Sequence, residues 1–563
     1  MTLGVAEHRP ALRRRRFKND DLVAVDLFSG FGGLTKGIED AGFTTIMAAN
    51  HNRYKVQVHE ANHPDAEHWV ADLVNKDASD YHSARDLPPA DMLAAGISCV
   101  NHSQANTKKA YRQGLSLFDL DDPEFEERVT RSERDRATAS CVLHYAAQHH
   151  PRLILVECTT ELTSWGPQVP GKKCGDGSTY RWWIKQFELL GYKYRVLYLN
   201  SQFFGVPQSR DRIYIAMWDA KLPTPDLDHR PHSWCDRCDK IVEAVWTWRT
   251  GVPPTGSVRY GKQYEYRCPS CRCVVVPPLT PSLAALDLSD LGTRIGDREK
   301  PLAASTMARA ERCRQRLAEF PAVLLPAKAA RGSDCRSRDL SQPLWSQTAT
   351  NTTCVITPPI ALAVDNYQGV PRGAGEPLPT QGGSETMALL SSGVVPFRKN
   401  TVPTTHAEAM PTVTAEQIPG VLTAAGRVQC NGSIDEAKYR SYPLDRPLGT
   451  VVGSAITQGR LFSGWFKQNG TSPEQFPAPP LLAEWRAALA ELPLEDCYFR
   501  MMAAHEVGRG CGFDVDFADH KGTFVVWGSA RNQVDGYGNA VSPPVGTWIG
   551  ARLRSALHRL EAA

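Results

Sequence analysis

The stretch Leu22-Val-Ala-Val-Asp-Leu-Phe-Ser-Gly-Phe-Gly-Gly33 decides the fold class of this 563-residue chain. Its first six residues form a short apolar run typical of a buried strand, and a helix-length segment follows the glycines. Glycines at such a junction let the backbone turn sharply and approach a ligand at the helix N-terminus, although a tight turn without a ligand has the same composition. The stretch therefore predicts a strand, a candidate ligand-binding turn and a helix.

The same alternation of strand and helix continues along the chain. Further apolar runs occur at 45–48, 91–94, 153–156, 194–199 and 213–217, and helix-length segments occur at 137–149 and 180–190. Strands that alternate with helices predict an α/β domain with a mostly parallel, Rossmann-like sheet covered on both faces. We expect residues 21–222 to form this domain, and the helical segment 545–560 near the C-terminus to close it.

Two CxxC pairs follow this region, Cys235-Asp-Arg-Cys238 and Cys268-Pro-Ser-Cys271, with 29 residues between them. Four thiolates with this spacing are typical of a structural Zn²⁺ ribbon, so we expect one in residues 223–280. Cys273 is a rival for the fourth ligand, and four unrelated thiols are the alternative. Closure by four cysteines would leave no open coordination position, which makes the metal structural rather than catalytic.

Residues 281–495 are rich in Pro, Gly, Thr and Ser, and short Pro-containing phrases recur at Pro301, Pro343, Pro377, Pro411 and Pro447. This repetition predicts similar turn-and-strand units in a separate, loop-rich and strand-rich domain. Residues 496–563 then return to the first domain. Residues 1–20 are expected to be a basic N-terminal arm, and its run Arg13–Arg16 is either a solvated tail or a phosphate contact.

The bulk composition is that of an ordinary globular protein, with 42% hydrophobic and 22% charged residues. A net charge of +3 neither requires nor excludes a nucleic-acid partner, because the clustering of basic residues decides that question. The sequence has no apolar run of 18 residues and no secretory signal pattern, so we expect a cytoplasmic protein without a membrane partner. Its 15 cysteines are then expected to be reduced.

Five motifs in order resemble those of the DNA (cytosine-5) methyltransferase family. Phe28-Ser-Gly-Phe-Gly-Gly33 is similar to its first motif, and Cys99 follows a predicted strand where the family places its nucleophile loop. Glu157 matches the Glu of Glu-Asn-Val, Gln208–Arg212 matches Gln-x-Arg-x-Arg, and Gly538–Pro543 matches the last motif. The Asn-His-Ser phrase after Cys99 and the ribbon are similar to an actinobacterial and phage subgroup.

The resemblance implies S-adenosylmethionine (SAM) as cofactor. Phe28 would stack on the adenine ring, Asp72 would lie beside its amine, and Asn50 stands where the family usually has a ribose-binding Glu. The residues that the resemblance assigns to the cofactor site are Asp26, Phe28, Ser29, Gly30, Gly32, Gly33, Asn50, His51, Asp72, Leu73, Asn539, Ala540 and Val541.

It also implies the catalytic residues. Cytosine C5 is a weak nucleophile, so the reaction needs a thiolate that adds at C6 and an acid that protonates N3. Cys99 would be the nucleophile and Glu157 the acid. Arg210 would orient the cytosine carbonyl or the glutamate, and Arg212 would support the loop. Ser98, Asn101, Ser103 and Gln208 complete the expected substrate-binding set.

The expected function is therefore methylation of C5 of a cytosine flipped out of double-stranded DNA, by a monomer whose residues 281–495 form the target-recognition domain. Candidate DNA contacts are Arg309, Arg312, Arg314, Arg316, Arg398, Lys399 and Asn400. Restriction–modification and phage DNA modification are the expected settings.

Two departures from the family pattern keep alternatives open. Ser98 and Val100 flank Cys99 where the family has Pro and Gln, and Cys158-Thr159 follows Glu157 in place of Asn-Val. The alternatives are a C5-transferase that uses a modified, for example carboxylated, SAM, a catalytically inactive DNA-binding paralogue, and an RNA cytosine methyltransferase.

Overall fold

The computed structural model describes residues 5–13, 20–97, 138–167, 175–249, 256–280, 292–304, 493–517 and 520–561, together with a few short stretches between them. Between residues 323 and 443 it describes the strands β16 to β24. Ser98, Cys99, Asn101, Ser103 and the seven candidate DNA contacts lie outside the described residues.

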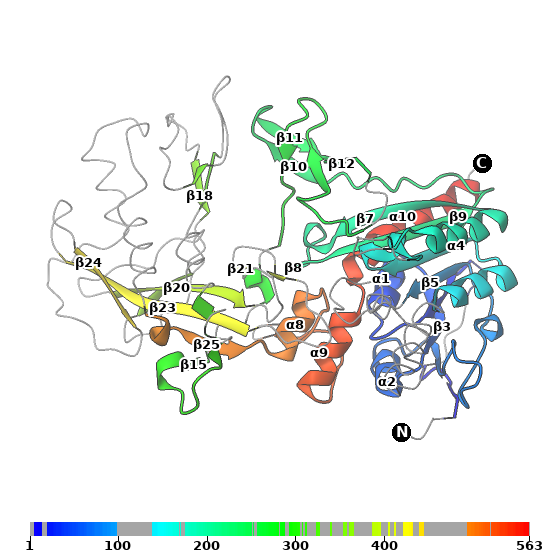
Figure 1. Cartoon of the computed structure of the whole chain (residues 1–563), viewed down its shortest axis with the longest axis horizontal. Helices are drawn as coiled ribbons and strands as arrows, with labels where there is room; N and C mark the ends of the chain where they lie inside the picture. Colours follow the sequence, from blue (N-terminus) through cyan, green and yellow to red (C-terminus); the bar gives the residue numbers. More distant parts are fainter. Residues whose placement is uncertain are drawn as a thin grey trace.

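The main sheet has eight strands in the order β1-β4-β3-β2-β5-β6-β9-β7 (Figure 1). The strands are β1 (Glu7–Arg9), β2 (Val23–Leu27), β3 (Thr44–Asn50), β4 (Glu67–Val70), β5 (Met92–Gly96), β6 (Leu153–Cys158), β7 (Tyr192–Asn200) and β9 (Asp211–Asp219). The five central strands from β4 to β6 are mutually parallel, and β9 runs antiparallel to both β6 and β7. The prediction of a mostly parallel α/β sheet is confirmed.

Helices cover both faces of this sheet, as the buried apolar runs of its central strands require. One core contains α1 (Gly33–Asp40) and α10 (Pro543–Glu561), whereas the other contains the helix at 138–149 and α4 (Ser178–Leu189). α1 and α10 pack closely, since a Cβ on Gly37 would lie 2.8 Å from the Cα of Gly546. The C-terminal helix therefore closes the first domain, as expected.

The N-terminal segment differs from the expected arm. Glu7–Arg9 forms the edge strand β1, which pairs antiparallel with β4. Arg9 forms ion pairs with Glu60 and Glu7 at 2.6 and 2.9 Å. The expectation that residues 1–20 are all an arm outside the first domain is thus wrong for these three residues; Arg13 is described, and the rest of the basic run is not.

A second, antiparallel sheet contains seven strands: β15 (Thr293–Arg294), β25 (Tyr498–Met501), β23 (Gly420–Asn431), β20 (Thr386–Val395) and β19 (Ile360–Val364) in that order, with β21 (Thr404–Thr405) and β24 (Lys438–Pro443) off this path. A three-stranded sheet contains β17 (Arg338–Asp339), β16 (Val323–Pro326) and β18 (Thr353–Ile356). These strands agree with the strand-rich region that the composition predicts. Because β25 belongs to the larger sheet, that sheet extends past the expected boundary at residue 495.

The chain returns from the second sheet through α8 (Ala504–Gly510) and α9 (Ala530–Asn539), which Figure 1 shows between the two large sheets. A third core joins Phe31 and Val58 of the first domain to Val507 and Tyr537 of these helices. The return segment is therefore packed against the turn that follows β2.

The cysteine-rich insert is a small unit with its own core. Its strands are β10 (His232–Cys235), β11 (Lys240–Glu243), β12 (Val245–Trp248), β13 (Tyr264–Arg267) and β14 (Val274–Val275), in one two-stranded and one three-stranded sheet. Tyr264 and Tyr266 are fully buried between them.

The remaining short elements complete the described structure. They are β8 (Gln208–Ser209), which pairs with β22 (Met410–Pro411), α2 (Arg53–Asn62), and the 3₁₀ turns η1 (Ala84–Asp86), η3 (Thr160–Ser164), η4 (Ser201–Phe203), η5 (Ser282–Ala285), η6 (Ile295–Asp297) and η8 (Leu494–Asp496). Among the described helices, none combines the length and the hydropathy that a bilayer span requires.

Candidate active site

The predicted site residues follow neighbouring strands of the main sheet. β4, β3, β2, β5 and β6 are adjacent and parallel, so their carboxyl ends meet at one edge, and β9 begins at that same edge because it runs the opposite way. In an open α/β sheet, the crevice beyond the carboxyl ends of the strands is where ligands bind. The topology therefore brings together segments that are up to several hundred residues apart in the sequence.

The glycine-rich turn after β2 has the conformation that its sequence predicts. Phe28, Gly30 and Gly32 have φ of 62°, 57° and 83°, which is the left-handed region that favours glycine. A Cβ on Gly33 would lie 2.1 Å from the carbonyl oxygen of Val541. Gly33 therefore allows the first motif and the last motif to touch.

Asp26 lies beneath this turn rather than on its surface. Its side chain is fully buried, and Oδ2 accepts a hydrogen bond from the Thr35 hydroxyl at 2.5 Å. Thr35 contacts His59 at 2.9 Å, and His59 contacts His68 at 2.7 Å, so a buried polar chain supports the turn. Burial raises the pKa of Asp26 to about 7. Because the carboxyl group faces this row of buried polar side chains, we expect Asp26 to affect a cofactor only indirectly, by supporting the turn.

Asn50 ends β3, Asp72 lies two residues after the end of β4, and both side chains organise local backbone. Oδ1 of Asn50 accepts a hydrogen bond from the backbone N–H of Asn52 at 2.9 Å. This bond does not involve the side-chain nitrogen of Asn50. Oδ1 of Asp72 accepts the N–H groups of Val74 and Asn75 at 2.9 and 3.1 Å.

The neighbours of these two residues differ in exposure. Leu73 is buried in the core, whereas His51 is exposed. The side chain of Leu73 is therefore a packing group in this structure, and only its backbone could face a cofactor.

Glu157 is the carboxylic acid of the site. It is the second-last residue of β6, pairs with Gly96 of β5, is 6% exposed, and its Oε1 lies 3.0 Å from Nε of Arg212. Burial raises the pKa of Glu157, and the positive charges of Arg212 and, second, Arg210 oppose that rise. The backbone N–H of Ile97 donates to the Glu157 carbonyl oxygen at 3.1 Å, and Ser98 and Cys99 follow Ile97 directly in the chain.

The two arginines of the Gln208–Arg212 motif have roles that differ from the expected ones. Arg212 pairs with the glutamate, whereas Arg210 is 4% exposed and its Nη1 donates to the carbonyl oxygen of Gly538 at 2.8 Å. Arg212 is thus the arginine whose guanidinium pairs with the glutamate, because the register of β9 against β6 brings it beside Glu157, while Arg210 acts on Glu157 as a second positive charge. Contact of Arg210 with the cytosine carbonyl stays a prediction.

Gln208, an expected substrate-binding residue, is fully buried, and its amide faces Sγ of Cys511 at 3.7 Å. In the last motif, Asn539 is exposed and donates to Asp535 at 3.2 Å, Ala540 is partly buried, and Val541 lies in the core beside Gly33. The first, third, fourth and fifth motifs thus meet at one place; Cys99 and its neighbours lie outside the described residues.

The four cysteines predicted as metal ligands also lie together. The sulfur atoms of Cys235, Cys238, Cys268 and Cys271 are all within 4.8 Å of one another, with 3.4 Å between those of Cys235 and Cys271. Cys273 is not part of this group within the described residues. A compact set of four thiols fits a closed, tetrahedral metal site.

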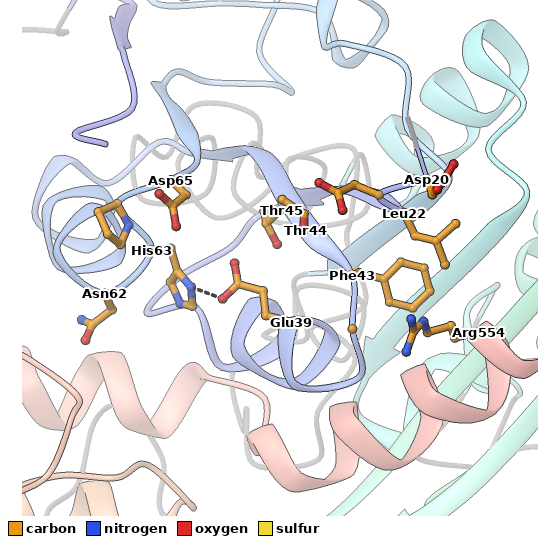
Figure 2. Close-up of a pocket in the computed structure, with 13 residues that line it drawn as sticks. Asp20, Leu22, Glu39, Phe43, Thr44, Thr45, Asn62, His63, Asp65 and Arg554 are labelled. Carbon is orange, nitrogen blue, oxygen red and sulfur yellow. Dashed lines mark hydrogen bonds and ion pairs between the residues drawn. The ribbon is translucent and has the colours of Figure 1, made fainter. Parts of the chain in front are cut away.

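A cavity of about 330 Å³ lies at the opposite end of β3 (Figure 2). Thr44 and Thr45, at the start of that strand, line it together with Glu39 and His63, which form an ion pair at 2.8 Å. Asn50 marks the other end of β3. None of the predicted site residues lines this cavity, so it is separate from the motif cluster.

Residues that no sequence motif marks also support the site. Thr35, His59 and His68 hold Asp26, and Asp211 lies between the two motif arginines. Alternation along Gln208–Arg212 is the signal that could have identified Asp211, because it places Asp211 on the face opposite to Arg210 and Arg212. No local signal marks the buried histidines.

Comparison with known proteins agrees with this geometry. The model of the family "C-5 cytosine-specific DNA methylase" matches residues 22–118 and 169–235. The type II methyltransferase M.NlaX of Neisseria lactamica is 27% identical over 210 residues, which cover 36% of this chain and 55% of that protein. M.NgoBI of Neisseria gonorrhoeae is 29% identical over 225 residues, which cover 39% of this chain and 59% of that protein.

The chain thus spans between half and three fifths of the length of these two relatives. Among solved structures, the S. pombe Dnmt2 methyltransferase aligns over 95% of this chain and 99% of that chain, with 10% identity and a TM-score of 0.37. That score carries no conclusion, and the fold rests on the strand order given above. Residues 22–118 and 169–235 of this chain are thus similar to the C-5 cytosine-specific DNA methylase family, and the curated type II methyltransferases resemble the chain over part of its length.

Proposed function

We propose that this protein is a DNA methyltransferase that transfers a methyl group from SAM to C5 of a cytosine. The observation that carries the proposal is the meeting of distant motifs at one sheet edge. There, the buried acid Glu157 is paired with Arg212 beside the point where the chain leads from Ile97 into Cys99. Such convergence of an acid, a cationic partner and a candidate nucleophile is what this reaction needs.

The edge of the sheet fits a cofactor of this kind. A Cβ on Gly30 or Gly96 would meet its nearest atom at 3.9 or 4.0 Å, an ordinary van der Waals distance, so neither glycine is crowded by the described residues. The Ser29 hydroxyl is buried and has no hydrogen-bond partner among the described residues. Phe28 directly follows β2, Asn50 ends β3 and Asp72 lies two residues after β4, and these three residues would hold the adenosine. When bound, SAM supplies an electrophilic sulfonium methyl group.

The side chains would carry the remaining steps. The Cys99 thiolate would form a carbon–sulfur bond to C6 of cytosine while Glu157 gives a proton to N3, and the resulting electron density at C5 makes that carbon the nucleophile for the methyl group. A base would then remove the proton from C5, the electrons of that C–H bond would restore the C5–C6 double bond and expel the thiolate, and N3 would return its proton to the Glu157 carboxylate. The nucleophile is thereby regenerated.

The environment of Glu157 suits an acid that works near neutral pH. A carboxyl group with an ordinary pKa is almost fully ionised at pH 7 and cannot donate a proton efficiently. Burial raises the pKa of Glu157, and Arg212 limits that rise while fixing the orientation of the carboxyl group. This combination is the usual way in which a carboxyl group is tuned for proton transfer.

We propose double-stranded DNA as the substrate, with the target cytosine flipped out of the stack, since C6 is inaccessible inside a duplex. Residues 281–495, with the second sheet, would be the target-recognition domain of a monomeric, cytoplasmic enzyme. We further propose that Cys235, Cys238, Cys268 and Cys271 hold a structural Zn²⁺, which their thiol cluster fits.

A mechanism-based trap tests the proposed chemistry. A duplex copied by a polymerase with 5-fluoro-dCTP presents every sequence context, and fluorine at C5 blocks the final proton removal. With SAM, the wild type should form an SDS-stable protein–DNA complex, whereas Cys99→Ala should form none. An adduct that persists in Cys99→Ala, or its absence from a wild type that binds SAM and DNA, would contradict the proposal.

A further inference from the structure

The stretch Gln208–Arg212 connects the candidate site to the cysteine-rich insert. Alternate residues contact opposite sides: Arg210 and Arg212 reach Gly538 and Glu157, whereas Asp211 faces the insert. Oδ1 of Asp211 accepts the backbone N–H of Tyr260 at 3.1 Å and the hydroxyl of Tyr264 at 2.9 Å. The insert therefore forms hydrogen bonds with this strand on the face opposite to Arg212.

The insert also holds the segment that follows Glu157. The turn η3 begins three residues after Glu157, and a loop of the insert forms three hydrogen bonds with it. Gly256 N–H donates to Ser164 Oγ at 2.6 Å, Ser257 Oγ donates to Glu161 Oε1 at 2.9 Å, and Val258 N–H donates to Thr160 Oγ1 at 3.1 Å. Both partners of the Glu157–Arg212 ion pair are thus flanked by contacts with one small unit.

The architecture of the insert explains how it can hold both segments firmly. Residues 256–264 lie between the two cysteine pairs, and Tyr264 is fully buried in the same core as Cys235 and Cys268. Trp246 stacks on Tyr264 with 5.0 Å between ring centroids, and its Nε1 donates to the Tyr198 carbonyl oxygen of β7 at 3.1 Å. Figure 1 shows the strands β10 to β12 above this side of the main sheet.

We propose that the cysteine-rich insert is a positioning unit for the Glu157–Arg212 pair, in addition to its place in the recognition region. Tyr264 acts through Asp211, and Ser257 acts through Glu161. Neither side chain contacts a residue to which the reaction is assigned, so both are positioning residues. The inference rests on the proposed function, because the pair matters only if Glu157 is the acid. Small displacements of such groups reduce turnover strongly, since catalysis depends on geometry within about 1 Å.

The chain contains a matched pair of tyrosines for the test. Tyr264 and Tyr266 are both fully buried on β13, and each loses one hydroxyl group when replaced by Phe. The Tyr266 hydroxyl lies 2.6 Å from Nδ1 of His229, whereas that of Tyr264 donates to Asp211. Tyr264→Phe should lower kcat by about tenfold and leave KM for SAM and DNA within about twofold, because one buried hydrogen bond of about 1.4 kcal/mol is lost. Tyr266→Phe should keep the wild-type kcat.

Conservative replacement at Asp211 separates positioning from general stability. Asp211→Asn keeps an oxygen that accepts from Tyr260 and Tyr264, so its kcat should stay within about threefold of the wild type. Asp211→Leu fills a similar volume without a hydrogen-bond acceptor, so its kcat should fall at least as far as that of Tyr264→Phe. Ser257→Ala, which leaves the insert core intact, should lower kcat in the same direction without changing the metal content.

Hydrogen exchange gives a readout that does not depend on activity. Amides of η3 and of Gln208–Arg212 should exchange faster in Tyr264→Phe than in the wild type, and at the wild-type rate in Tyr266→Phe. This result would support the coupling even if the wild type methylated no DNA, an outcome that would count against the proposed function alone. Equal kcat and equal exchange in the two tyrosine variants, in a wild type that methylates DNA, would overturn the positioning role.

Discussion

The guanidinium Nε of Arg212 lies 3.0 Å from Oε1 of Glu157, and both side chains are largely shielded from solvent. Arg210, two residues earlier, instead donates to the Gly538 carbonyl oxygen. The two arginines of one motif therefore have different roles. Arg212 sets the charge environment of the candidate acid, and Arg210 holds the last motif against the rest of the site.

Replacement of Arg212 tests the first role. Arg212 favours the ionised form of Glu157, so Arg212→Gln should raise the pKa of Glu157 above its already raised wild-type value. If protonated Glu157 is the acid, activity falls as pH rises through that pKa, and the alkaline limb of the kcat profile should move to higher pH. The value of kcat at its optimum should decrease, because the orientation of the carboxyl group is lost. A limb that stays in place or moves to lower pH would show that Glu157 is not the titrating acid.

Replacement of Arg210 tests the second role. Arg210→Ala leaves the buried Gly538 carbonyl oxygen without this donor, at a cost of about 1–3 kcal/mol, and loosens the segment that Val541 fixes against Gly33. SAM affinity, measured by calorimetry on the purified protein without DNA, should decrease by about tenfold. Unchanged SAM affinity together with a collapse of kcat would instead favour contact between Arg210 and the cytosine carbonyl.

The contact between Gly33 and Val541 predicts a strong difference between two glycines of the same turn. An alanine Cβ at position 33 would lie 2.1 Å from a backbone oxygen, so the last motif would have to move. At Gly30 the nearest atom is 3.9 Å away, and only the positive φ of 57° opposes a side chain, at a cost of about 1–2 kcal/mol. Gly33→Ala should therefore reduce SAM binding and the melting temperature more than Gly30→Ala does. The reverse order would contradict the packing described here.

Metal content distinguishes the cysteines of the insert. The purified protein should contain one Zn²⁺ per chain, and Cys268→Ser should lose it and unfold at lower temperature, because one of the four clustered thiols is gone. Cys273→Ser is the matched control: its sulfur is outside the cluster, so metal content should stay at the wild-type level. Loss of zinc from Cys273→Ser with retention in Cys268→Ser would reverse the ligand assignment.

The strand pattern and the motif order predicted much of the site. Buried apolar runs identified β2, β3, β5 and β6 but not β4, and the cysteine pairs lie together as their spacing predicts. The division of labour between Arg210 and Arg212 could not be read from the chain, because residues two apart in an extended stretch point the same way. Only the register of β9 on β6 and the position of Gly538 separate them.

Other features depended on partners that are distant in the sequence. The segment Glu7-His-Arg9 carries no apolar alternation, and it becomes a strand because β4 offers a free edge. Asp26 stands at a position of the glycine-rich motif where a ligand-contacting residue is expected, yet its carboxyl group faces Thr35. The support that Tyr264 and Ser257 give to the site likewise depends on how the insert packs on the first domain, which residue spacing does not encode.

The central claim is Cys99-dependent modification of cytosine at C5, and nucleoside mass spectrometry of host DNA tests it most directly. DNA would be digested from cells that express the wild type, the Cys99→Ala variant or neither. We expect 5-methylcytosine in the first sample and only background in the other two. An unmodified cytosine pool in cells that contain folded wild-type protein, a heavier adduct in place of 5-methylcytosine, or equal 5-methylcytosine with Cys99→Ala would contradict this claim.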